Sequence, residues 1–132
     1  MMPTPTPDTV PFWDAAKEGR LVVQFCLACE RHYFYPRDHC PTCGSADVEW
    51  RAVSGRGRLV SYVINHRPMP PTEDGAPLVI ALVELVEGVR LLTNIVGTPA
   101  DPAALPLDAA VTVGFQQRGE WQLPVFHVDG VA

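Results

Sequence analysis

Four cysteines are the residues of this sequence whose type and spacing could do chemistry. They form two Cys-x-x-Cys pairs, Cys26 with Cys29 and Cys40 with Cys43, and they are all the cysteines of the chain. A two-residue gap lets both thiolates of a pair face one ion from a tight turn, and two such pairs complete a tetrahedron. We therefore predict a metal site with these four ligands. The ion should be structural, because four protein sulfurs leave no open position for water or substrate.

Other interpretations of the cysteines stay open at this point. The ligand set favours zinc, although rubredoxin-type iron sites use similar turns. Disulfides, a redox Cys-x-x-Cys and buried free thiols are further alternatives. A secreted disulfide scaffold would normally follow a signal peptide, whereas the stretch 1–11 has neither a basic start nor an apolar run. No apolar stretch reaches the roughly 18 residues of a membrane span, so we expect a cytoplasmic protein with reduced thiols.

Composition limits the fold and the partners. The chain has 132 residues, of which 47% are apolar, enough for one domain or two small modules with a buried core. Its 14 prolines and 10 glycines favour short strands and turns over long helices. The formal charge of −5 opposes general nucleic-acid binding, which requires many cations to neutralise phosphates.

The elements that must position the cysteines begin with a short helix. We expect residues 1–7 to be a disordered leader. Asp8 and Thr9 offer N-cap oxygens, and Gly19 is a natural stop. The Phe12-Trp13 pair between them must pack on something, because two helical turns are not stable alone. Either the chain's own ribbon or a partner subunit could provide that surface.

A zinc ribbon is predicted over residues 21–51. A strand over 20–25 delivers the first cysteine pair, and a short strand over 48–50 closes the ribbon. His32 and His39 lie close to the cysteines in sequence, but four thiolates already satisfy the ion, so we assign both to the surface. The ribbon's core is too small to fold without metal.

A β-barrel is predicted over residues 52–132, after the sequence Ser54-Gly55-Arg56-Gly57. Glu87-Gly88 predicts a hairpin between two of its strands. Five short strands with long loops suit a Greek-key barrel of the OB type, with a small open sandwich as the alternative. We expect the strand over 78–86 to be buried on both faces, since nearly all its residues are apolar. The predicted strands cover residues 58–65, 78–86, 89–97, 111–116 and 123–128.

Catalytic residues are not evident in the sequence. There is no nucleophile motif, no phosphate-binding glycine loop and no His-x-x-x-His pair. His66 and His127 are isolated, and the carboxylate pairs Glu73/Asp74 and Asp101/Asp108 fall in predicted loops. We therefore predict that the chain does not catalyse a reaction by itself.

Four arginines form the one notable charged stretch. Arg51, Arg56, Arg58 and Arg67 have no acidic residue among them. Arginine's planar donor fork suits phosphate, and the glycines on either side of Arg56 would let an anion approach the backbone. The alternative is solvated charge on a strand edge.

A family resemblance extends over residues 11–127. The sequence resembles the small zinc-ribbon and OB-fold proteins that accompany thiolase-like enzymes in acyl-CoA metabolism. Glu30 departs from the glycine that the family usually has there, which predicts a left-handed turn at Glu30. The matching motifs are Pro11-Phe12-Trp13, Gly19-Arg20-Leu21, Cys40-Pro41-x-Cys43-Gly44, Trp50, Ser54-Gly55-Arg56-Gly57, Ala81-Leu82-Val83-Glu84-Leu85, Glu87-Gly88-Val89-Arg90-Leu91 and Pro124-Val125-Phe126.

The resemblance implies a non-catalytic accessory subunit. Its partner would be a thiolase, hydroxymethylglutaryl-CoA synthase or a thiolase-like sterol side-chain aldolase, in an assembly with two copies of each chain. The barrel would help to complete the partner's acyl-CoA site, with the four arginines as phosphate contacts. Phe12, Trp13 and Tyr35 are candidate anchors on the partner, because aromatic residues dominate interface energetics.

Two other functions remain to be distinguished from this one. A single-stranded nucleic-acid binder would need interleaved aromatic and basic residues on one sheet, yet Tyr62 is the only aromatic residue between Arg58 and Val113. An electron carrier with iron in the ribbon would be coloured when purified.

Overall fold

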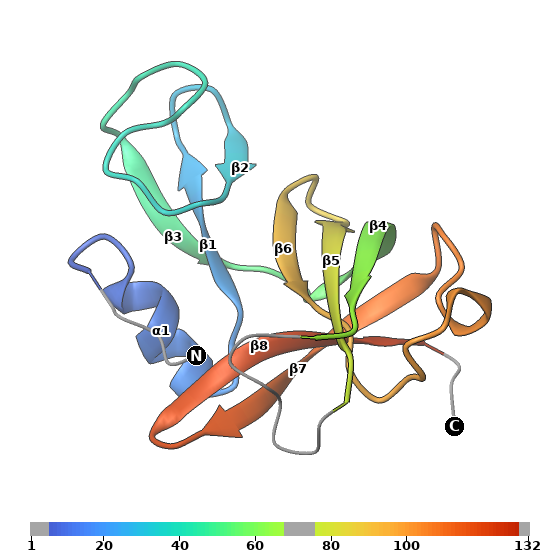
Figure 1. The fold of residues 1–132 in the computed structure, drawn as a ribbon. Coiled ribbons are helices and arrows are strands. Elements are labelled where there is room, and N and C mark those ends of the chain that lie inside the picture. Colours follow the sequence, from blue (N-terminus) through green and yellow to red (C-terminus); the bar gives the residue numbers. More distant parts are fainter. Residues whose placement is uncertain (1–5, 68–75, 130–132) are drawn as a thin grey trace.

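In its described part, the chain folds into a three-stranded ribbon, a five-stranded barrel and one α-helix (Figure 1). The computed structural model describes residues 6–67 and 76–129. The mainly β architecture predicted from the sequence is confirmed. The elements are α1 (Val10–Lys17), β1 (Val22–Cys26), β2 (Arg31–Tyr33), β3 (Val48–Ala52), β4 (Arg56–Asn65), β5 (Leu78–Leu85), β6 (Arg90–Asn94), the 3-10 helix η1 (Pro102–Ala104), β7 (Ala110–Arg118) and β8 (Trp121–Val128).

Helix α1 begins and ends close to the predicted positions. Thr9 occupies the N-cap position, but its hydroxyl accepts a hydrogen bond from the Thr6 amide at 2.8 Å and makes no cap to the helix, so the predicted side-chain cap is wrong. Gly19 ends the helix with φ of 74°, and the Arg20 amide donates to the Ala15 carbonyl at 2.9 Å, as in a Schellman motif. Within the described ranges, no helix is long and apolar enough to span a membrane.

The ribbon is an antiparallel sheet in the order β2-β1-β3. Every residue of the central strand β1 is buried, and β2 and β3 pair with its two edges. Gln24 is the polar exception in that strand. Its side-chain oxygen accepts a hydrogen bond from the Arg37 amide at 2.6 Å, which satisfies the buried group.

The barrel sheet has the order β6-β5-β4-β7-β8, so β4 is central and pairs with both β5 and β7. A bridge between Ile95 and Phe126 brings the two edge strands together, and the sheet is nearly closed. This pairing confirms the OB-type barrel. The predicted β5–β6 hairpin is also confirmed, but β7 and β8 form a second hairpin that the sequence analysis missed, at Gly119 with φ of 59°.

One apolar core runs from the helix and the base of the ribbon into the barrel. Phe12, Leu21 and Val23 are buried in the same cluster as the barrel residues. The expectation that 78–86 is buried on both faces is wrong: in β5 fully buried and half-buried residues alternate, so one face points into the core. The predicted division at residues 20/21 and 51/52 stays a prediction. The leader up to residue 5, and Glu73 with Asp74, lie outside the described residues.

Candidate metal centre and adjoining pocket

The four predicted metal ligands lie together at the tip of the ribbon. Their sulfur atoms are all within 4.8 Å of one another. The Cys26 and Cys43 sulfurs are 3.5 Å apart, and those of Cys29 and Cys40 are 3.7 Å apart. A tetrahedral ion with Zn–S bonds of about 2.3 Å requires S···S edges of about 3.8 Å, whereas a disulfide requires about 2.05 Å. The arrangement therefore fits one tetrahedral ion and does not fit disulfides.

Two tight turns orient these thiols toward one another. The Cys29 amide approaches the Cys26 sulfur at 3.5 Å, and the Thr42 amide approaches the Cys40 sulfur at 3.4 Å. Glu30 has φ of 56°, which confirms the left-handed turn predicted after the first pair. Gly44 takes the equivalent position after the second pair, with φ of 75°. Such amide contacts stabilise thiolates, as a four-cysteine metal site requires.

Two of the clustered thiols, those of Cys40 and Cys29, have pKa values shifted in opposite directions. Backbone hydrogen bonds, first that of Cys43, hold the pKa of Cys40 at about 6. Desolvation, followed by hydrogen bonds from the neighbouring thiols, raises the pKa of Cys29 to about 12. A cation at the centre would favour four thiolates, because a coordinated thiol gives up its proton.

The two neighbouring histidines do not enter the cysteine cluster. His32 packs its ring against Phe25, with centroids 4.8 Å apart. The His39 side chain is exposed and lies 2.8 Å from the Asp38 carboxylate, which lowers the pKa of Asp38. Cysteines alone make up the cluster among the described residues.

The four arginines are not brought into one site. Arg51 pairs with Glu49 at 2.9 Å and lies over the Phe25 ring at 3.7 Å. Arg56 is the first residue of the ten-residue strand β4, which spans about 30 Å, and Arg67 lies two residues beyond the end of that strand. Their role as phosphate contacts stays a prediction.

Arg58 already has two carboxylate partners within the chain. Its guanidinium contacts Glu84 at 2.6 Å and Asp108 at 2.5 Å, and these hydrogen bonds raise its pKa. Glu84 and Asp108 are distant in sequence, so the local absence of acidic residues did not reveal them. Arg56, by contrast, makes no ion pair with another described residue.

Gly55 and Gly57, on either side of Arg56, let neighbouring strands pack closely against the backbone. A Cβ on Gly55, which has φ of 75°, would lie 2.2 Å from a Val113 methyl group. A Cβ on Gly57 would lie 2.3 Å from the Glu84 carbonyl oxygen. The chain's own atoms thus fill the side of each glycine where a side chain would project, so both positions require glycine. Ser54, just before them, donates its amide to the Glu87 carboxylate at 2.8 Å.

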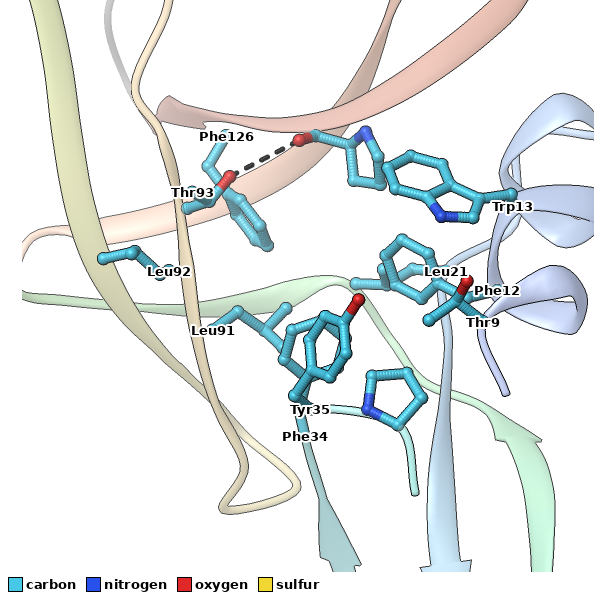
Figure 2. Close-up of a pocket in the computed structure, with 12 residues that line it drawn as sticks. Thr9, Phe12, Trp13, Leu21, Phe34, Tyr35, Leu91, Leu92, Thr93 and Phe126 are labelled. Atoms are coloured by element: carbon cyan, nitrogen blue, oxygen red, sulfur yellow. Dashed lines mark hydrogen bonds between the residues drawn. The ribbon is translucent and has the colours of Figure 1, made fainter. Parts of the chain in front are cut away.

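An apolar pocket lies where α1, the end of β2, β6 and β8 meet (Figure 2). It has a volume of about 350 Å³. Twelve described residues line it, and none of them carries a charged side chain. No sequence signal could have located this pocket, because its walls come from four separate stretches: 9–21, 34–36, 91–93 and 124–126.

The three predicted partner anchors differ in exposure. Phe12 is 8% exposed and contacts Trp13 and Phe34, so it anchors the helix on its own chain. Trp13 stacks edge-on with Trp121 of the barrel, at 6.1 Å between ring centroids. Only Tyr35, which is 60% exposed at the rim of the pocket, offers a large free aromatic surface.

Comparison with known families accounts for most of the chain. The model of the ChsH2 rubredoxin-like zinc ribbon domain matches residues 13–49, and the model of the ChsH2 C-terminal OB-fold domain matches residues 50–116. The chain belongs to the ChsH2 family. The zinc-ribbon and OB-fold family recognised in the sequence is thereby confirmed.

The relatives of this chain include a hydratase subunit and a scaffold protein. The chain is similar to the 3-oxo-4,17-pregnadiene-20-carboxyl-CoA hydratase alpha subunit of Mycobacterium tuberculosis, at 35% identity over 98% of the chain and 40% of that subunit. It is 36% identical to a DUF35 domain-containing scaffold protein of Methanothermobacter thermautotrophicus, over 72% of the chain and 71% of that protein. The chain spans between 36% and 40% of the length of the curated hydratase subunits that it matches.

A solved structure of a ChsH2 protein agrees with this fold over nearly its whole length. A chain of an Ltp2-ChsH2(DUF35) aldolase superposes with a TM-score of 0.83 at 38% identity. The match covers 96% of this chain and 98% of that chain. The name of that structure joins ChsH2(DUF35) to Ltp2 in an aldolase.

Proposed function

We propose that the chain is a non-catalytic accessory subunit that binds and stabilises a thiolase-like lyase or aldolase acting on acyl-CoA thioesters. The observation that carries the proposal is its similarity, over 98% of that chain, to the ChsH2 component of an Ltp2-ChsH2(DUF35) aldolase. The scaffold protein of M. thermautotrophicus supports the same role, since the chain covers 71% of it.

The side chains of the described residues support a non-catalytic role. The four thiols face one another, which leaves no sulfur directed at a substrate. His32 packs on a phenylalanine ring and His39 pairs with Asp38. The carbon–carbon bond chemistry therefore falls to the partner, and this chain contributes surface and rigidity.

The metal of the proposed subunit is a structural zinc ion held by Cys26, Cys29, Cys40 and Cys43. The sulfur spacing and the match to a zinc ribbon domain support this choice. One zinc per chain in a colourless preparation is the expected result of metal analysis. A coloured protein containing iron would contradict the choice.

The assembly that we propose contains two copies of each chain, in the cytoplasm, where reduced thiols can hold the metal. Its substrate is a bulky acyl-CoA, and the printed name of the M. tuberculosis hydratase subunit supports a sterol side chain as one such group. Arg56 and Arg67 are the arginines best able to meet CoA phosphates. Arg51 and Arg58 contribute less, because carboxylates of the chain already pair with them.

Co-expression with the thiolase-like enzyme of the same organism tests the proposal. We expect a stable complex in size-exclusion chromatography with light scattering, and acyl-CoA cleavage or condensation only when the enzyme is present. The enzyme purified without this chain should be less stable or less active. A chain that remains alone, or that binds oligonucleotides with a steep salt dependence, would contradict the accessory role.

A further inference from the structure

The apolar pocket contains a polar group that is free to meet a ligand. Figure 2 shows the Tyr35 hydroxyl pointing into the pocket, toward Phe12 and Leu21. This hydroxyl has no hydrogen-bond partner among the described residues. The other two hydroxyls of the lining are occupied: that of Thr9 donates to the Thr6 carbonyl, and that of Thr93 donates to the Pro124 carbonyl at 3.4 Å.

The size and lining of the pocket define the chemistry of its ligand. Its volume of about 350 Å³ falls within the roughly 300–1,000 Å³ of small-molecule sites. Because none of the described lining side chains is charged, an ion entering the pocket would lose its hydration without gaining a counter-charge. The ligand should therefore be uncharged and largely apolar.

The walls of the pocket are held in place before any ligand binds. The Arg37 amide donates to Gln24 at 2.6 Å, and the Tyr33 hydroxyl donates to the Arg37 carbonyl at 2.9 Å. These bonds fix the loop that carries Tyr35 to the ribbon. Across the pocket, Phe12 is buried against Phe34, with ring centroids 5.4 Å apart. A preformed site lowers the entropic cost of binding.

We infer that this pocket binds a bulky, uncharged apolar group whose oxygen accepts a hydrogen bond from the Tyr35 hydroxyl. The group is a ring or a branched hydrocarbon with one carbonyl. It is supplied either by the acyl part of a thioester or by a free small molecule. The inference does not depend on the enzyme partner proposed above, because a single chain supplies every wall of the pocket.

The test uses the isolated, metal-loaded full chain. N-Phenyl-1-naphthylamine, an uncharged dye that fluoresces in apolar surroundings, should bind with one site per chain and be displaced by the bicyclic ketone 2-decalone. Tyr35→Asp places a carboxylate at the rim of the pocket, at a side chain that is 60% exposed, and it should weaken dye binding at least tenfold. Leu107→Asp is the matched control, since Leu107 is 62% exposed and does not line the pocket.

Tyr35→Phe tests the hydrogen bond without changing the shape of the wall. We expect 2-decalone to bind about fivefold more weakly, which is the usual effect of one neutral hydrogen bond. Decalin, the hydrocarbon without the carbonyl, should bind equally to both proteins. Displacement of the dye by cyclohexanecarbonyl-CoA would identify an acyl group as the source of the ligand, and displacement by the free ketone alone would identify a small molecule.

The inference is overturned if the dye does not bind, if both aspartate variants bind it equally, or if Tyr35→Phe leaves the affinity for 2-decalone unchanged. An enzyme complex that forms while the dye does not bind would retain the accessory role and overturn only the ligand site. Specific ligand binding by a chain that never associates with a thiolase-like enzyme would retain the ligand site and overturn the accessory role.

Discussion

The ribbon and the barrel are both antiparallel sheets, but their buried apolar residues are distributed very differently. The barrel contributes fully buried side chains along its length, among them Leu59, Val83 and Phe126, each with no exposed surface. The buried members of the core cluster include none between Val23 and Leu59, the stretch that contains the whole metal end of the ribbon. The barrel is thus held by hydrophobic burial, whereas the tip of the ribbon depends on its ion.

The helix and the first ribbon strand join these two regions. Phe12, Leu21 and Val23 belong to the barrel's core cluster although they precede the cysteines in sequence. Removing the metal should therefore affect the tip of the ribbon first and leave the shared base packed. Perturbing the junction should weaken both regions at once.

Loss of the metal is expected to have the largest effect. Chelation, or Cys40→Ser, should abolish the hydrogen-exchange protection of β2 and of the two cysteine turns, because binding the ion supplies the folding energy of this part. Amides of β4 and β5 should remain protected, since the barrel core is independent of the ion. Partner binding should be lost together with the ribbon tip.

Thr42→Ala is the control for that experiment. Thr42 lies between the two cysteines of the second pair, and its contact with the Cys40 sulfur uses the backbone amide, which alanine retains. This variant should keep its metal and its protection pattern. Ribbon amides that stay protected without metal would show that the tip has enough packing to fold alone.

Truncation of a buried side chain where α1 joins the ribbon to the barrel should have the next largest effect. Phe12→Ala removes a ring that is 8% exposed and packed against Phe34 of the ribbon, so we expect a loss of about 3–5 kcal/mol in unfolding free energy. Chemical denaturation followed by tryptophan fluorescence would measure it. Val10→Ala, on the same helix at 40% exposure, should change stability by less than about 0.5 kcal/mol. Equal effects would mean that the helix does not stabilise the core that the ribbon base and the barrel share.

The sequence was informative where the determining signals are local. The Cys-x-x-Cys spacing predicted the cluster of thiols, and Glu87-Gly88 predicted the β5–β6 hairpin. The second hairpin escaped because Gln116, Gln117 and Gln122 break the apolar pattern at the ends of β7 and β8. A turn with a plain glycine signal can therefore be missed when the strands on either side of it are polar.

Contacts that are distant in sequence could not be predicted in the same way. The partners of Arg58 lie 26 and 50 residues away, at Glu84 and Asp108. The pocket likewise depends on how the helix, the ribbon and two barrel strands meet. Sequence spacing alone suggested phosphate binding at Arg58, which stays a prediction, and it could not reveal the ion pairs that the fold forms there.

Glu87→Gln should have a smaller effect on the unfolding free energy. The Glu87 carboxylate contacts Ser54, which lies in the linker between β3 of the ribbon and β4 of the barrel. The carboxylate accepts hydrogen bonds from the Ser54 amide at 2.8 Å and from the Ser54 hydroxyl at 3.2 Å. Because these bonds are exposed to water, we expect a loss of only about 1 kcal/mol in unfolding free energy. The double variant with Ser54→Ala should lose less than the sum of the two single changes. Additive losses would show that the carboxylate does not hold the linker through the Ser54 hydroxyl.

Arg58→Ala should have the smallest effect, and it should depend on salt. The arginine is 45% exposed, so water and ions screen its pairs with Glu84 and Asp108, and we expect the melting temperature to fall by no more than about 2 °C at low ionic strength. The difference should disappear near 1 M salt. Arg56 lies two residues away on β4 and makes no ion pair among the described residues. Arg56→Ala should therefore not change the melting temperature, but it should weaken acyl-CoA binding by the enzyme complex. If Arg58→Ala weakened that binding as much, both arginines would contact the ligand despite the carboxylates beside Arg58.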